Sequence, residues 1–150
     1  MNFVVGQLII HCSETMSFWL FVSLIEDCEM RDIFLPRLPG LYKHSQIIEA
    51  LVRKYLPEVS SHFITHNIKA EMYASEWIFG LFASVIPLEE MSHFFDHFFV
   101  SRWIFFYQLI LCILKFNQRQ LLNEEDIYQI LSNIKCHSAA SMSNGNKQKG

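Results

Sequence analysis

Charged side chains are scarce in this sequence of 150 residues, at 18% against a typical value of about 25%. Hydrophobic residues make up 51% of the chain and include 14 phenylalanines. This composition supplies a large core but little polar surface with which to cover it. Either the chain packs against another structure, or it forms only part of a domain.

Basic residues are neither numerous nor clustered. The 12 Lys and Arg are outnumbered by 15 Asp and Glu, which gives a net charge of −3, and Arg53-Lys54 is the only adjacent basic pair. Phosphate binding requires a concentrated basic face. We therefore expect no nucleic acid among the partners of this protein.

Cysteine and glycine motifs are also missing. Cys12, Cys28, Cys112 and Cys136 contain no C-x-x-C pair, which argues against a disulfide framework and indicates a reducing, intracellular compartment. The 5 glycines form no G-x-G-x-x-G or Walker pattern. No phosphate-binding loop and no cofactor are predicted.

Uninterrupted apolar runs are short. Residues 77–88 and 103–114 are runs of twelve, interrupted by Ser84 and Gln108 respectively, whereas a membrane span needs about 20 apolar residues. The first residues lack the basic start and the small-residue cleavage site of a signal peptide. We predict buried helices here, with no membrane span. The alternative, a small membrane protein, is eliminated if the chain is soluble without detergent.

The hydrophobic periodicity is helical almost everywhere, as in the stripe of Ile47, Ile48, Leu51, Val52, Tyr55 and Leu56. No stretch alternates apolar and polar residues for long enough to propose a strand. We therefore predict an all-α fold. The expected helices cover residues 3–12, 14–27, 41–56, 58–66, 70–86, 88–100, 103–117 and 124–136.

Proline, asparagine and glycine set the expected boundaries. Pro57 and Pro87 each end one helix and are followed by acidic residues that favour the start of the next. Asn123 followed by three acidic residues predicts another helix start. Residues 28–40 contain two prolines and a glycine and are expected to form the main loop. From 137 to 150 the sequence is small, polar and aperiodic, which predicts a disordered tail.

One group of residues could suggest a metal site. His93, Asp96 and His97 share a helix face, with the two histidines spaced as in H-E-x-x-H. The Glu of that motif and a third ligand are both absent, so no metal is predicted. Asp96 is expected to have a polar partner if it is buried, and Trp19, Trp77 and Trp103 are expected to anchor packing. Cys12 and Cys28 lack any local signature of a nucleophile.

Five stretches, in order along the chain, form a family pattern. They are Phe18-Trp19, residues 30–34 leading to 38–41, residues 56–57 with 61–63, residues 75–82 followed by 86–87, and residues 95–98, in which Phe95 replaces a tryptophan. Together they resemble the C-terminal part of a TBC domain, the fold of Rab GTPase-activating proteins. The signature residues, expected to be structural, are Phe18, Trp19, Arg31, Pro39, Pro57, Trp77, Phe82, Pro87 and Asp96.

The resemblance implies an orthogonal multi-helix array over residues 1–136 and a Rab-type small GTPase as partner. Members of this family insert an arginine from an I-x-x-D-x-x-R motif and a glutamine from a Y-x-Q motif into the nucleotide site of the GTPase. Neither motif occurs here. The opening Met1-Asn2 resembles the residues that follow Y-x-Q in the family, so both fingers are expected upstream of this chain, which contains no catalytic residue.

Two functions follow as hypotheses. The first is a partial Rab GTPase-activating domain, inactive alone, whose missing N-terminal half is a further partner. The second is a non-catalytic module that binds a small GTPase or a scaffold through an exposed apolar face. Either function places the chain in the cytoplasm, or peripherally on endomembranes through its GTPase partner.

Overall fold

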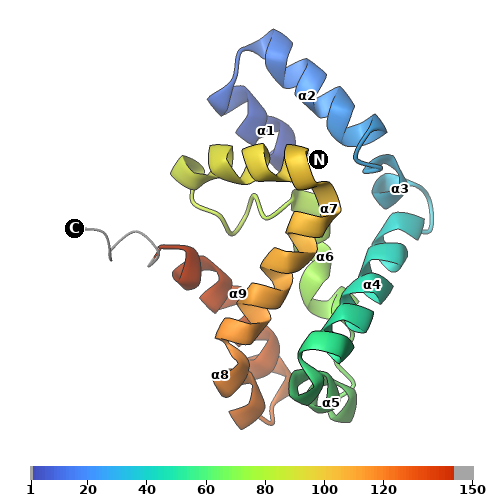
Figure 1. Cartoon of the computed structure of the whole chain (residues 1–150), viewed down its shortest axis with the longest axis vertical. Coiled ribbons are helices and arrows are strands. Elements are labelled where there is room, and N and C mark those ends of the chain that lie inside the picture. The colour runs from blue at the N-terminus through green and yellow to red at the C-terminus, as the bar shows by residue number, and fades with distance from the viewer. Residues whose placement is uncertain (1, 144–150) are drawn as a thin grey trace.

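The protein is an array of helices in the computed structural model, which describes the backbone of residues 2–143 and the side chains of residues 3–135 (Figure 1). No strand occurs in that part of the chain, so the all-α prediction is confirmed. The elements are α1 (Asn2–His11), α2 (Glu14–Glu26), α3 (Arg31–Phe34), α4 (Pro39–Tyr55), α5 (Pro57–Thr65), α6 (Ala70–Gly80), the 3-10 helix η1 (Leu88–Glu90), α7 (Met91–Phe116), α8 (Gln118–Asn123) and α9 (Ile127–Ser143).

The helices α4 to α9 form the body of the molecule. Helix α4 contacts α5, α6 and α7, while α9 contacts α6, α7 and α8. Large side chains fill the space between these helices, and five aromatic ones are almost completely buried: Tyr73, Trp77, Phe82, Phe98 and Phe106. Burial of each such side chain stabilises the fold by roughly 1.5–3 kcal/mol before the entropy cost of ordering it.

Helices α1 and α2 form a hairpin at the opposite end of the molecule from α5 and α8 (Figure 1). The two helices contact each other, and each contributes a buried leucine, Leu8 on α1 and Leu24 on α2. The hydroxyl of Ser17 is also buried and donates to the backbone oxygen of Leu8 at 2.9 Å. Ser13 caps α2 by accepting from the backbone N–H of Met16, as expected for a serine at this position.

Helix α7 is divided by a break at Arg102, where φ is 52° and ψ is −136°. The sequence predicted this gap between helices 88–100 and 103–117. Leu88–Phe116 is long and apolar enough, by length and composition alone, to cross a membrane. The break divides it into helical pieces that are each shorter than the roughly 20 residues of a span. Phe98 and Phe106 are buried on the two sides of the break, but only 28% of the apolar window is buried in the described structure.

Two predicted boundaries in the middle of the chain are wrong. The expected loop over 28–40 contains the short helix α3. The expected helix over 70–86 ends at Gly80, because Leu81 and Phe82 adopt left-handed backbone conformations with φ of 46° and 59°. Both side chains are completely buried. Core packing therefore outweighs the cost of a positive φ, which periodicity cannot reveal.

The C-terminal boundaries also differ from the prediction. Asn123 ends α8, which was not expected, and α9 begins at Ile127 instead of 124. The carboxylate of Asp126 accepts from the backbone N–H of Tyr128 at 3.0 Å and so supplies the cap. Helix α9 continues to Ser143, into the segment predicted to be disordered; Ala139 and Ala140 favour this extension. The predicted tail from 144 onward lies outside the described residues.

Candidate functional site

Two of the signature residues, Trp77 and Phe82, form the aromatic centre of the body. Their rings stack with centroids 5.1 Å apart and an interplanar angle of 25°. Phe106 from α7 lies 5.0 Å from Phe82, and Tyr73 meets Trp77 edge-on at 6.0 Å. This cluster joins α6, the turn after it and α7.

The signature prolines mark chain turns. Pro39 and Pro57 are the first residues of α4 and α5, and Pro87 immediately precedes η1; proline favours such positions because its φ is already helical. Gly40 follows Pro39 where α3 and α4 approach closely. A Cβ atom on Gly40 would lie 2.6 Å from the backbone nitrogen of Ile33. The Pro-Gly pair therefore fixes the tight contact between these two helices.

The other aromatic signature residues are exposed. Phe18 and Trp19 are 58% and 64% exposed, and their rings meet edge-on at 5.3 Å on α2. Phe3, Ile9, Ile10 and Met16 on α1 and α2 are exposed as well, and we call these six exposed side chains together the hairpin face. The expectation that Trp19 anchors packing is wrong within the described part of the chain. The reason is that no described helix covers this side of α2.

The charged signature residues lie at the surface. Arg31 forms an ion pair with Glu26, which joins the start of α3 to the end of α2. Asp96 is exposed on α7, so it needs no buried partner. His93 and His97 are also exposed, and no group of three potential metal ligands exists among the described side chains.

The break in α7 holds the end of the hairpin. The guanidinium of Arg102 donates to the backbone oxygen of Asp27 at 2.5 Å, and the indole of Trp103 donates to the backbone oxygen of Cys28 at 2.7 Å. These carbonyls follow the last turn of α2 and lack helical partners. The left-handed φ of Arg102 is unfavourable for a residue with a side chain. Two hydrogen bonds to the end of α2 accompany this strain. We call the region around Asp27, Cys28, Arg102 and Trp103 the junction.

His44 on α4 lies beneath the indole of Trp103. The two rings stack with centroids 3.8 Å apart, and Nδ1 of His44 shares a 2.6 Å hydrogen bond with the hydroxyl of Tyr107. Lys43 and Glu29 form a 2.7 Å ion pair at the edge of the junction. Sequence reasoning identified the break but not His44, because a single histidine on a helix gives no signal of what it contacts.

Three titratable side chains of the junction, those of His44, Tyr107 and Cys28, are held in their neutral forms. Burial, and secondarily the charge of Lys43, lowers the pKa of His44 to about 4. Burial, assisted by the charge of Glu29, raises the pKa of Tyr107 to about 12. Burial also raises the pKa of the Cys28 thiol. A neutral imidazole, a phenol and a thiol that keep their protons at neutral pH suit a structural contact better than acid–base chemistry.

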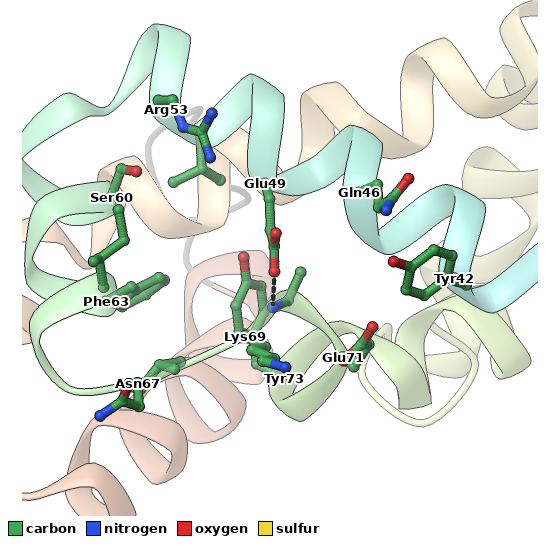
Figure 2. Close-up of a pocket in the computed structure, with 14 residues that line it drawn as sticks. Tyr42, Gln46, Glu49, Arg53, Ser60, Phe63, Asn67, Lys69, Glu71 and Tyr73 are labelled. Atoms are coloured by element: carbon green, nitrogen blue, oxygen red, sulfur yellow. Dashed lines mark hydrogen bonds between the residues drawn. The ribbon is translucent and has the colours of Figure 1, made fainter.

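A groove of about 330 Å³ lies between α4, α5 and α6 (Figure 2). Glu49 points into it from α4 and accepts from the backbone N–H of Ala70 at 3.1 Å, which caps the start of α6. Arg53, Lys69 and Glu71 also line the groove, so its charges are balanced. It contains no cysteine or histidine that could act as a nucleophile or a base.

The described part of the chain is an all-helical scaffold with exposed apolar side chains, and we find no group of catalytic side chains in it. The family model for the Rab-GTPase-TBC domain matches residues 1–122. The chain therefore belongs to the Rab-GTPase-TBC domain family, as the sequence resemblance predicted. Helix α9 lies beyond the matched residues.

Relatives from animals and fungi agree with this family. The chain is 30% identical to the Ecotropic viral integration site 5 protein homolog of Homo sapiens over 120 residues, which are 80% of this chain and 15% of the relative. It is 32% identical to the GTPase activating protein Gyp51 of Schizosaccharomyces pombe over 122 residues, 81% of this chain and 12% of the relative. It is also 32% identical to GTPase-activating protein GYP5 of Saccharomyces cerevisiae over 127 residues, which are 84% of this chain and 13% of the relative. The chain thus spans about an eighth of the length of such relatives.

Proposed function

We propose that this chain supplies the C-terminal part of a Rab GTPase-activating domain and that it does not accelerate GTP hydrolysis by itself. The family match and the ordered signature support the first claim. The absence of both I-x-x-D-x-x-R and Y-x-Q from the 150 residues supports the second. The complete domain would act on a Rab-type GTPase in the cytoplasm or at an endomembrane.

The proposal is testable because an arginine finger, which this chain lacks, has a large effect on the rate of GTP hydrolysis. An arginine finger raises the rate of GTP hydrolysis by about 10³–10⁵, which corresponds to roughly 4–7 kcal/mol of transition-state stabilisation. Scaffold residues such as Trp77 and Phe82 cannot replace it, because their rings are buried. The finger residues are proposed to come from a segment that precedes this region in a complete domain.

Single-turnover GTP hydrolysis by a panel of Rab proteins tests this proposal. The chain alone should leave the rates unchanged, and the complete catalytic domain of GYP5 serves as the positive control. A chimera joins this chain to the part of the GYP5 domain that precedes the matched residues, where the arginine and glutamine fingers are proposed to lie. It should recover stimulation. Stimulation of about 10³ or more by the chain alone contradicts the proposed inactivity; failure of a folded chimera contradicts the proposed place in the domain.

The hairpin face favours a second function, that of a non-catalytic interaction module. Phe18 and Trp19 form an exposed aromatic pair, and exposed aromatic clusters mark protein interfaces. Such a module would bind a small GTPase or a scaffold without changing hydrolysis. Trp19→Ser should then abolish binding of a Rab panel to the immobilised chain, with Val100→Ser on α7 as the matched exposed control. A chain that binds neither a GTPase nor a hydrophobic dye contradicts this function.

A further inference from the structure

Two hollows adjoin at the end of the molecule opposite the hairpin, and they provide a surface distinct from the hairpin face. The first, of about 520 Å³, is lined by Tyr55, Leu56, Leu111, Cys112, Lys115 and Phe116. The second, of about 460 Å³, is lined by Glu58, Lys115, Phe116, Gln118, Arg119 and Leu122. Both are lined by Lys115 and Phe116, so they are adjacent, and we call the two hollows together the Phe116 groove.

The floor and walls of the Phe116 groove are largely apolar. Leu111, Cys112, Lys115 and Phe116 occur at i, i+1, i+4 and i+5, so they share one face of α7. Phe116 is 71% exposed, and Tyr55 on the opposite wall is 56% exposed. Apolar side chains that line a groove between helices match the mode in which an amphipathic helix inserts its apolar face.

The rim of the groove is positively charged. The ammonium of Lys54 lies 5.2 Å from the centre of the Tyr55 ring, and the ammonium of Lys115 donates to the neutral amide of Gln118 at 2.8 Å. Arg119 lines the second hollow. None of these three cations forms an ion pair with a described side chain.

Among the described side chains, Glu58 is the only carboxylate that lines the Phe116 groove, and it offsets only part of the positive charge. Its Oε2 accepts from the side chain of Gln118 at 2.6 Å, so this carboxylate is engaged within the second hollow. The groove is therefore locally basic in a chain whose net charge is −3. The positive charge at the groove favours an occupant with acidic side chains.

We propose that the Phe116 groove binds an amphipathic helical peptide whose apolar face is flanked by Asp and Glu. A second copy of the chain is a poorer occupant, because a two-fold contact would bring the same cations together. An anionic membrane surface is also disfavoured, since membrane-binding clusters usually contain about 4–8 basic residues. The groove is independent of the Rab-GAP proposal, because it involves neither the hairpin face nor the missing fingers.

Fluorescence anisotropy with the full chain tests the proposal. The probe is a labelled helical peptide with leucines at i, i+3, i+4 and i+7 and glutamates on both flanks; the control peptide replaces each glutamate with lysine. We expect the acidic peptide to bind at least about tenfold more tightly, and Phe116→Ser and the double variant Lys115→Glu, Arg119→Glu to weaken it about tenfold or more. Raising the salt to about 1 M should weaken binding as well.

Matched variants separate groove effects from folding effects. Val100→Ser removes another highly exposed apolar side chain, and Arg37→Glu reverses another exposed cation; both should leave the affinity unchanged. Circular dichroism confirms that each variant is folded. Equal affinity for the two peptides, no effect of Phe116→Ser, or binding to phosphatidylserine vesicles without binding to the peptide each overturns the proposal.

Discussion

The hairpin and the body contain the same kind of signature residue, but they use it in opposite ways. Trp77 in the body is 1% exposed and stacks on Phe82, whereas Trp19 in the hairpin is 64% exposed and touches Phe18 edge-on. Both tryptophans lie in apolar helical patterns. The difference is that helices from several directions surround α6, while one side of α2 is uncovered. A family signature therefore includes core residues and surface residues that sequence alone does not distinguish.

Truncating the two tryptophans should produce the largest contrast. Trp77→Ala removes a buried ring and should lower the free energy of unfolding by about 3–5 kcal/mol. Trp19→Ala should change it by no more than about 0.5 kcal/mol. Urea denaturation followed by circular dichroism measures both. A loss of similar size in the two variants would show that the hairpin face is covered in solution.

The pH dependence of stability should reveal the buried His44 of the junction. Its pKa is lowered from 6.5 to about 4, so between these pH values the unfolded chain holds a proton that the folded chain does not. The free energy of unfolding should therefore decrease as the pH falls through this window, by about 3 kcal/mol from this histidine. Urea midpoints measured across the window should fall more steeply for the natural chain than for His44→Gln. Parallel slopes contradict this assignment.

Substituting two glycines, Gly40 and Gly6, by alanine should change the stability by intermediate amounts. Gly40→Ala places a Cβ atom against the backbone of α3 and should cost about 1–3 kcal/mol of stability. Gly6→Ala in the hairpin meets nothing within 4 Å and should gain about 0.5–1 kcal/mol from better helix propensity. Opposite shifts in thermal midpoint are expected. Shifts of the same sign would show that the approach of α3 to α4 is looser than described.

Trp103→Phe at the junction should produce the smallest difference between the hairpin and the body. The variant keeps an aromatic ring over His44 but loses the hydrogen bond to the Cys28 carbonyl, which should cost about 1 kcal/mol. Hydrogen exchange measured by mass spectrometry should become faster in α1 and α2 and stay unchanged in α6. Uniform acceleration in both regions would mean that the hairpin does not open separately from the body.

Local patterns predicted much of the fold, because helix periodicity and proline positions depend on nearby residues. Pro57 started a helix where expected, and the break near Arg102 was found. The failures have tertiary causes. Leu81 and Phe82 leave the helical conformation because the core holds their side chains, and the Cys28–Gly40 stretch forms α3 where it packs on α4.

The candidate site was less predictable than the fold. The signature located Trp77 and Trp19 but could not tell that only one of them is buried. His44 contacts Trp103 and Tyr107, and Tyr107 lies 63 residues further along the chain. No sequence motif links these positions. The Phe116 groove combines α4, α5, α7 and α8, so its shape depends on how separate helices assemble.

The two donors at the break in α7 both bind main-chain oxygens, of Asp27 and Cys28, and not side chains. Any amino acid at positions 27 and 28 presents the same carbonyl groups. These two hydrogen bonds therefore require Arg102 and Trp103 but set no requirement on the side chains at positions 27 and 28, where Cys28 is restricted by its burial instead. Searches for correlated substitutions between the two segments would miss this attachment, even though it joins the hairpin to the body.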